Sequence, residues 1–272
     1  MNQVVLRHLV AKFGHLLKMP SYFTTPSRLR AYADALWAKG CRFSNCIGFI
    51  DGTLRRTTRP KLMQRSVYNG HKKYHGQKYQ NVTFPDGMIV DQHGPYAGRR
   101  SDPYMMVHSG ICHRLHTRCR FPLNTPERIA EHTPADPAAP TFFSPMEGPP
   151  THIQYMLFGD KGYHTQDSGC IQVPFKRYAG YELLDDEKSF NKDMAAVRVT
   201  AEWGFCRVLQ LWGYLDHYKQ MKWFQTPLAH YYIAATLLSN IHNCIHPNAA
   251  SRKYNVAPPT LEEYLAFPVP AV

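Results

Sequence analysis

The stretch Cys46-Ile-Gly-Phe-Ile-Asp51-Gly-Thr53 predicts a buried strand that delivers one carboxylate at its end. Ile47, Phe49 and Ile50 are apolar, and the two residues after Asp51 are expected to break the strand. A carboxylate in apolar surroundings costs several kcal/mol unless a cation neutralises it, so a metal ion is a natural partner. An ordinary Asp-Gly turn is the alternative interpretation.

Two further acids occur in comparable settings. The apolar run 153–158 ends at Gly159-Asp160-Lys-Gly-Tyr163 and predicts a second strand with an aspartate behind it. A helix is expected from residue 192 to about 215, capped by Asn191, because apolar residues recur at spacings of three and four. Its apolar stripe contains Ala195, Val199, Glu202, Phe205, Cys206 and Leu209. A glutamate in that stripe either pairs with Arg198, one turn back, or binds a metal.

The order of the remaining elements predicts an α/β fold with a mixed central sheet flanked by helices. Residues 26–39 read as a helix that packs beside the first strand, and residues 227–244 as a second core helix. Residues 78–84 and 88–93 form a hairpin around Pro85-Asp86-Gly87, and 170–176 predicts a short strand near an edge. A helix is expected after Ser101 or Asp102 as N-cap, which is a sufficient structural reason for Asp102.

Composition favours a globular protein with a polyanionic partner. The chain has 272 residues, 44% of them hydrophobic, a formal net charge of +12 and a pI near 9.4. Nucleic acid is the first candidate for such a charge, and a basic solubilising surface is the alternative. No apolar run is long enough for a membrane span and the first twenty residues lack a signal-peptide pattern, so a soluble, unsecreted protein is expected.

The cysteines indicate reduced thiols and an intracellular setting. There are seven, and none forms a Cys-x-x-Cys pair. Cys112, His113, His116 and Cys119 cluster within eight residues, but so short a segment rarely wraps four side chains around one zinc ion.

Basic residues gather behind Asp51 and before Asp102. Arginine and lysine interleaved with tyrosine, as in Tyr68-Asn-Gly-His-Lys-Lys-Tyr-His75, suit contact with phosphates and stacking on bases. A solvated loop is the alternative. The predicted nucleic-acid-binding residues are Arg55, Arg56, Lys72, Lys73, Arg99 and Arg100.

Acids brought together by one core would repel each other unless divalent cations neutralised them. Hard oxygen ligands select Mg²⁺ or Mn²⁺ over zinc. Two such ions about 4 Å apart would clamp the attacking and leaving oxygens of a phosphodiester displacement. The acids and the basic surface then account for each other.

Four motifs in this order resemble the Harbinger (PIF) transposase-derived nucleases, DDE-type enzymes with a ribonuclease H-like core. The matching stretches are Ile50-Asp51-Gly52-Thr53, Gly98-Arg-Arg-Ser-Asp102, Gly159-Asp160-Lys-Gly-Tyr163, and Asn191 through Arg198 to Glu202-Trp203-x-Phe205, within about residues 44–245. Cys206 departs from the glycine that often follows the phenylalanine in this family.

The resemblance implies a DNA endonuclease or transposase-derived protein that cleaves phosphodiester bonds by a two-metal mechanism. It assigns catalysis to Asp51, Asp160 and Glu202, and metal binding to these three and to Asp102, whose role as ligand or helix cap stays open. It also implies DNA as partner, a separate Myb-like DNA-binding protein, and the nucleus as location. The N-terminal DNA-reading region of full-length transposases is not seen.

Three parts of the chain are expected: an N-terminal helical segment at 1–43, the nuclease domain at 44–245 with a proline-rich, irregular insertion at 122–151, and a loose C-terminal tail at 246–272. One rival to the enzyme is a domesticated or inactive copy that binds DNA or protein without cutting. A weaker rival is a basic scaffold whose acids form ordinary ion pairs.

Overall fold

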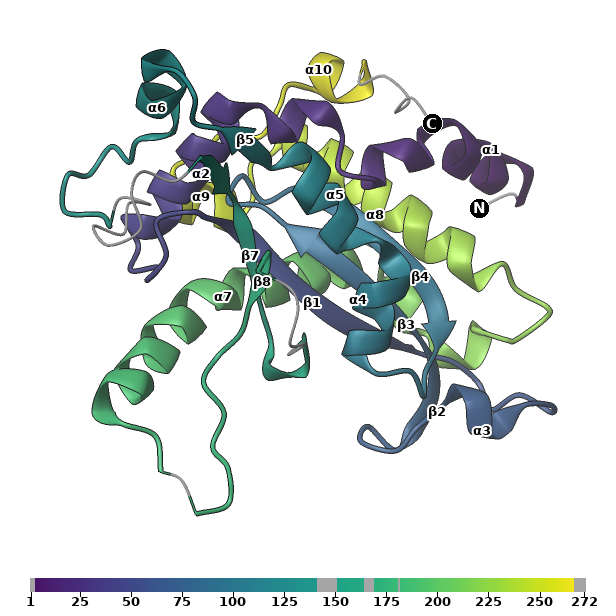
Figure 1. Ribbon diagram of the computed structural model, residues 1–272. Helices are drawn as coiled ribbons and strands as arrows, with labels where there is room; N and C mark the ends of the chain where they lie inside the picture. The colour runs from purple at the N-terminus through teal and green to yellow at the C-terminus, as the bar shows by residue number, and fades with distance from the viewer. Residues whose placement is uncertain (1–2, 141–150, 164–168, 181, 267–272) are drawn as a thin grey trace.

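Strand β1 (Cys46–Arg56) lies at the centre of a mixed six-stranded sheet in the computed structural model, which describes residues 3–140, 151–163, 169–180 and 182–266 (Figure 1). The strand order is β2-β3-β1-β7-β8, and β4 pairs with β3. Relative to β1, β3 is antiparallel and β7 is parallel, and β8 continues parallel to β7. This is the predicted α/β architecture with a mixed sheet flanked by helices, consistent with a ribonuclease H-like core.

The described strands form the main sheet and a separate two-stranded ladder, and they differ widely in length. Besides β1, the strands are β2 (Tyr68–Asn69), β3 (Tyr74–Thr83), β4 (Ile89–Ala97), β5 (Arg120–Pro122), β6 (His152–Gln154), β7 (Met156–Gly159) and β8 (Ile171–Gln172). The pair β5-β6 forms the separate ladder, and β8 lies at an edge of the main sheet, as predicted.

Helices surround this sheet. The α-helices are α1 (Gln3–Phe13), α2 (Pro26–Trp37), α3 (Gln64–Val67), α4 (Asp102–Ser109), α5 (Ile111–Arg118), α6 (Pro126–His132), α7 (Asp185–Leu211), α8 (Leu228–Ile245), α9 (Ala249–Tyr254) and α10 (Leu261–Leu265). The 3₁₀ turns are η1 (Gly14–Leu17), η2 (Ser21–Thr24), η3 (Lys161–Tyr163), η4 (Gly213–Asp216) and η5 (Tyr218–Gln220). No helix of the described residues is both long and apolar enough to cross a membrane.

The two faces of β1 pack into different clusters of the hydrophobic core. Ile47 and Ile50 belong to the largest buried cluster, which includes side chains of α2 and α5. Phe49 belongs to a second cluster with Phe158 of β7 and Met194 of α7. A strand covered on both faces needs apolar residues on both, which explains the continuous apolar run before Asp51.

The expected end of β1 at Asp51 is wrong. The strand continues for five residues to Arg56, because β3 pairs with it from Phe49↔Thr83 to Arg56↔Gly76. Asp51 is therefore held in mid-strand by its pairing with Asn81 of β3, one residue beyond the last pair of β1 with β7. The Asp-Gly turn interpretation is excluded by the same pairing.

The hairpin turn between β3 and β4 is the predicted Pro85-Asp86-Gly87. Gly87 has a φ of +77°, and a Cβ there would lie 2.2 Å from Oδ1 of Asn248. Asn248 donates to the Gly87 carbonyl (3.0 Å) and caps α9 by accepting from Ala250 N at 2.9 Å. Only glycine fits this turn, and the turn fixes the position of α9.

Helix α7 differs from its prediction in its start and in its buried face. It begins at Asp185, so Asn191 lies inside the helix and is not its cap; the Asn191 side chain instead bonds to both backbone groups of Phe175 (2.9 and 3.1 Å). The buried residues of α7 are Met194, Val197, Thr200, Ala201, Gly204, Phe205 and Val208. The predicted stripe was out of phase, because its Ala195, Glu202 and Cys206 are exposed.

Two segments predicted as irregular contain helices. Within 122–151, residues 126–132 form α6, started by Pro126 and capped by Thr125; residues 141–150 lie outside the described part. In the expected tail, α9 and α10 pack on the core through buried Tyr254 and Tyr264. Two buried tyrosines supply enough apolar area to hold such short helices.

The cysteines are all free, as predicted. Among the described residues, no three His, Cys, Asp or Glu side chains lie close enough to hold one metal ion, and this includes the Cys112–Cys119 cluster.

Candidate active site

Asp51 is a largely desolvated carboxylate in the middle of the sheet. Its side chain is 17% exposed, accepts from its neighbour Gly52 N at 2.7 Å, and lies 3.1 Å from Nη1 of Arg198 on α7. Burial raises the pKa of Asp51 to about 6, opposed by the Arg198 charge and the Gly52 N–H. Asp160 and Glu202 raise this pKa further, so three acidic charges converge here.

Glu202 pairs with Arg198, one of the two alternatives that the sequence left open. Nη2 of Arg198 lies 3.0 Å from Oε1 of Glu202, so a single guanidinium bridges Asp51 and Glu202. The expectation that Glu202 lies on the inward face of the helix is wrong, because its side chain is 54% exposed. It borders the site from the solvent side.

Asp160 reaches the same place through the parallel pairing of β7 with β1. Ile50 pairs with Gly159, so the residues that follow them, Asp51 in β1 and Asp160 just after β7, come together where this ladder ends. Asp160 itself is exposed, at the point where β7 ends and η3 begins. The predicted strand followed by an aspartate is confirmed, with β6 and β7 in place of one continuous strand.

Asp102 is the first residue of α4 and is not the helix cap. The cap is Ser101, whose hydroxyl accepts from Tyr104 N (3.4 Å). Asp102 instead pairs with Lys78 of β3 at 2.8 Å. The Asp102 carboxylate lies close against two glycines. A Cβ added to Gly52 would lie 2.9 Å from a carboxylate oxygen of Asp102, and a Cβ added to Gly162 would lie 2.7 Å from the other oxygen.

Tyr163 is a site residue that the sequence reasoning quoted in a motif but did not assign. Its side chain is 1% exposed, and its hydroxyl has no hydrogen-bond partner among the described residues. Burial raises the pKa of Tyr163 above its ordinary value, and the charges of Asp102, Asp51 and Asp160 raise it further. The spacing of three residues behind Asp160, one turn of η3, is the signal that could have found it.

The donor chemistry of these residues suits a divalent cation, while the four acids, as they stand in the part of the chain that the structure describes, lie too far apart for any three of them to hold one ion. Converging carboxylates already hold one cationic group, Arg198, and an unpaired buried hydroxyl faces three of the acids. An unsatisfied buried hydroxyl costs about 1–3 kcal/mol, and a water bound to a nearby ion is a partner that would satisfy it. All oxygen donors in this set suit Mg²⁺ or Mn²⁺.

Five of the six predicted nucleic-acid-binding residues are exposed. Lys72 and Lys73 lie on the turn between β2 and β3, and Arg99 and Arg100 precede α4. The two stretches lie side by side, because Asn69 donates to the Gly98 carbonyl at 2.8 Å. We call Lys72, Lys73, Arg99 and Arg100 the basic cluster.

The two remaining arginines behave differently from each other. The guanidinium of Arg56 is exposed and stacks on the ring of Tyr218, 3.8 Å from its centroid. Arg55 is half-buried, bonds to Thr53 and lies over the Tyr232 ring. Its head group therefore points into the protein, toward α8, and the structure does not place it with the exposed basic residues.

A family model described as DDE superfamily endonuclease matches residues 50–240. This range includes Asp51, Asp102, Asp160 and Glu202. No curated protein and no solved structure matches the chain significantly.

Proposed function

The chain belongs to the DDE superfamily endonuclease family, whose model covers most of its length, and from this premise we propose that it is a divalent-metal-dependent DNA endonuclease. The finer assignment, to the Harbinger transposase-derived branch, rests on the four motifs of the sequence. The observation that carries the proposal is that Asp51 and Glu202 share one cation, the Arg198 guanidinium, while the nearby charge of Asp160 raises the pKa of Asp51.

Asp51, Asp160 and Glu202 are the residues proposed to hold two Mg²⁺ or Mn²⁺ ions, with Asp102 as a further ligand. Divalent ions at such a site stabilise the charge that develops on a phosphodiester during its cleavage. Arg198 would hold the carboxylates apart from one another until the ions replace it. Asp102 would exchange Lys78 for an ion in the same way.

DNA is the proposed substrate because the site opens beside exposed cations. The basic cluster lies next to Asp102 in space, since Lys78 contacts both the Arg100 carbonyl (3.0 Å) and the Asp102 carboxylate. Phosphates on this cluster would bring the adjacent backbone toward the acids. A separate Myb-like DNA-binding protein and a nuclear location complete the proposal, on the strength of the family resemblance alone.

The test is a titration with Mn²⁺ and Mg²⁺ followed by thermal unfolding and by cleavage of plasmid DNA. An ion that binds only the folded state stabilises it, by about 2.7 kcal/mol at a hundred times its Kd. We expect a rise in Tm and metal-dependent nicking for the native chain, and neither for Asp51→Asn or Asp160→Asn. Glu131→Gln, an exposed carboxylate on α6, is the matched control and should behave as the native chain.

Equal metal effects on all variants, or none on any, would contradict the catalytic proposal. DNA binding that persists in that case would support the rival function, a copy that binds DNA without cutting it. A chain that also fails to bind DNA would leave the acids as ordinary ion pairs.

A further inference from the structure

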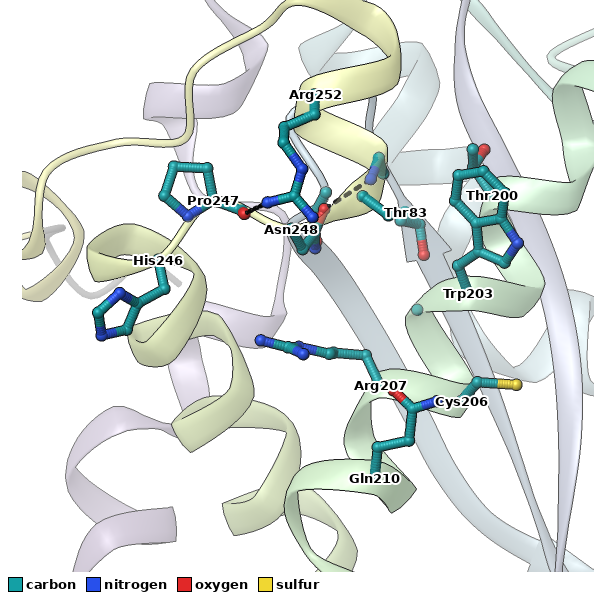
Figure 2. Close-up of a pocket in the computed structure, with 14 residues that line it drawn as sticks. Thr83, Thr200, Trp203, Cys206, Arg207, Gln210, His246, Pro247, Asn248 and Arg252 are labelled. Carbon is teal, nitrogen blue, oxygen red and sulfur yellow. Dashed lines mark hydrogen bonds between the residues drawn. The ribbon is translucent and has the colours of Figure 1, made fainter.

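A cavity lies beside helix α7, on a face next to the one that carries Glu202. Its volume is about 370 Å³, which falls within the roughly 300–1,000 Å³ typical of ligand pockets. Side chains from α7, from the segment between α8 and α9, and from α9 surround it (Figure 2). We call it the α7–α9 pocket; the residues used below are Gly87, Trp203, Arg207, His246, Asn248 and Arg252.

The lining of this pocket carries positive charge without acidic residues. Arg207 and Arg252 line it, neither forms an ion pair with a described carboxylate, and His246 adds a titratable ring. Arg252 donates to the Pro247 carbonyl, and Nη2 of Arg207 lies 3.3 Å from Nδ1 of His242. Two arginines without counterions in one hollow attract an anion.

The positive charges near this pocket affect the pKa of a neighbouring histidine, His242. Burial lowers the pKa of His242, and the charges of Arg207 and His246 lower it further. The field at this end of α8 is therefore positive. A bound anion would relieve it.

Trp203 adds an aromatic wall. Its side chain is 38% exposed, which is unusual for a tryptophan, and the Lys253 ammonium lies 5.4 Å from the centre of its ring. Trp203 and Arg207 lie one turn apart on α7, and Trp203 directly follows Glu202 in the sequence. A phosphate alone would need no aromatic ring, whereas a nucleotide offers both a phosphate and a base to stack.

We propose that the α7–α9 pocket binds one nucleotide of a DNA strand, with its phosphate on Arg207 and Arg252 and its base against Trp203. This inference rests on the proposed function in one respect, that the partner is DNA. Helix α7 would then connect the two sites. One face of α7 presents Glu202 to the phosphate that is cleaved, and the neighbouring face holds a nucleotide outside the cleavage site. The Asn248 contact with Gly87 keeps the pocket open by fixing α9.

The experiment measures binding of a fluorescent single-stranded oligodeoxythymidine by anisotropy, with EDTA present so that no cleavage can occur. Base stacking on an aromatic residue contributes about 5- to 150-fold in affinity, so Trp203→Ala should weaken binding by about tenfold. The double variant Arg207→Ala/Arg252→Ala should weaken oligonucleotide binding by about as much. The slope of its affinity against salt concentration should also fall by about the amount expected for one phosphate contact.

Three controls keep the outcome interpretable. Arg207→Lys retains the charge and should retain most of the binding, which separates charge from folding. Arg7→Ala removes an exposed arginine of α1 that does not line the pocket and should bind as the native chain. The Tm rise with Mn²⁺ should be unchanged in the pocket variants, so failure of the pocket and failure of the metal site give different results.

Unchanged oligonucleotide affinity in Trp203→Ala and in the double arginine variant would overturn the inference. So would equal displacement of the oligonucleotide by inorganic phosphate in the native chain and in Trp203→Ala, because the site would then recognise phosphate only.

Discussion

Arg198 is the residue that neutralises two of the acids, Asp51 and Glu202, in the folded, metal-free chain. Its guanidinium contacts Asp51 at 3.1 Å and Glu202 at 3.0 Å, and only 22% of the side chain is exposed. A charge pair of this kind is maintained only while both partners are present, since removing one leaves the other desolvated and unpaired. The same position makes Arg198 a competitor of any ion that binds these carboxylates.

Replacing Arg198 by glutamine should therefore destabilise the metal-free protein and strengthen its response to metal. We expect a loss of about 1–2 kcal/mol at neutral pH, discounted because Glu202 is exposed. Mn²⁺ should restore this loss at an ion concentration about tenfold lower than the native chain requires, as followed by thermal unfolding. Arg42→Gln, which removes an exposed partner of Asp193 on the same helix, is the control. A weaker metal response in Arg198→Gln would show that Arg198 positions the carboxylates and does not compete.

Gly162 holds Asp102 in place by having no side chain. A Cβ at Gly162 would lie 2.7 Å from Oδ2 of Asp102, closer than side chains approach. Gly162→Ala should push the carboxylate away from Lys78 and lower the unfolding free energy by about 1–3 kcal/mol. Gly213→Ala, at a glycine with open space around it, should change stability little. Chemical denaturation of both variants measures the difference, and equal stabilities would show that Asp102 moves aside without cost.

At the scale of elements, helix α8 holds the β3-β4 hairpin with two buried asparagines. Asn240 accepts from Ile89 N (3.0 Å) and donates to Ile89 O (2.8 Å), as a neighbouring strand would. Its amide also donates to the hydroxyl of Tyr264 on α10. Asn243 donates to the Asp86 carbonyl in the hairpin turn at 3.0 Å. The C-terminal helices are thus part of the scaffold that fixes β4.

Asn240→Ala should unfold this junction before the rest of the molecule. The change leaves both backbone groups of Ile89 buried without partners, which costs about 2–4 kcal/mol. Hydrogen exchange should accelerate at Ile89 and in residues 261–265, while residues in β1 keep their protection. Ile245→Ala, exposed near the end of α8, is the matched control. Uniform acceleration across the sheet would contradict a local role.

At the scale of the whole molecule, the sequence supports those features that depend on local pattern. The apolar run before Asp51 and the one before Asp160 predicted the two strands that place these acids, and turn chemistry predicted the hairpin at Asp86-Gly87. The fold class followed from the order of these elements. Three of the four helices whose positions were predicted needed only small changes in their ends, and the fourth, α7, begins earlier than expected.

What the sequence did not predict depends on contacts between distant segments. Asp51 lies in mid-strand because β3 pairs beyond it, and nothing near Asp51 reports that pairing. The face of α7 was misassigned because Ala195 and Cys206, counted as apolar, are exposed, while small Gly204 is buried. Tyr163 became a site residue only when η3 turned its hydroxyl toward three acids from separate segments.

The dependence of stability on pH gives a test of the whole core. Asp86 is fully buried, accepts from the Tyr32 hydroxyl at 2.6 Å and from Met88 N at 3.0 Å, and has no ion-pair partner among the described residues. Burial raises the pKa of Asp86 to about 6, against 3.8 ordinarily. Between these two pKa values the folded state binds more protons than the unfolded state. The contribution of the protonated Asp86 carboxyl to stability is therefore complete below pH 4 and is lost as the pH rises through 6. The loss is about 3 kcal/mol at most.

Asp86→Asn should remove this part of the dependence of stability on pH, measured by urea unfolding from pH 4 to 8, because an amide does not titrate. The variant should still fold, since its amide oxygen can accept from Met88 N as the carboxylate does. Asp185→Asn is the control, since Lys188 lowers the pKa of Asp185 and its titration falls below this window. An unchanged slope in Asp86→Asn would assign the pH dependence to Asp51 and Asp91, the other described aspartates whose pKa burial raises.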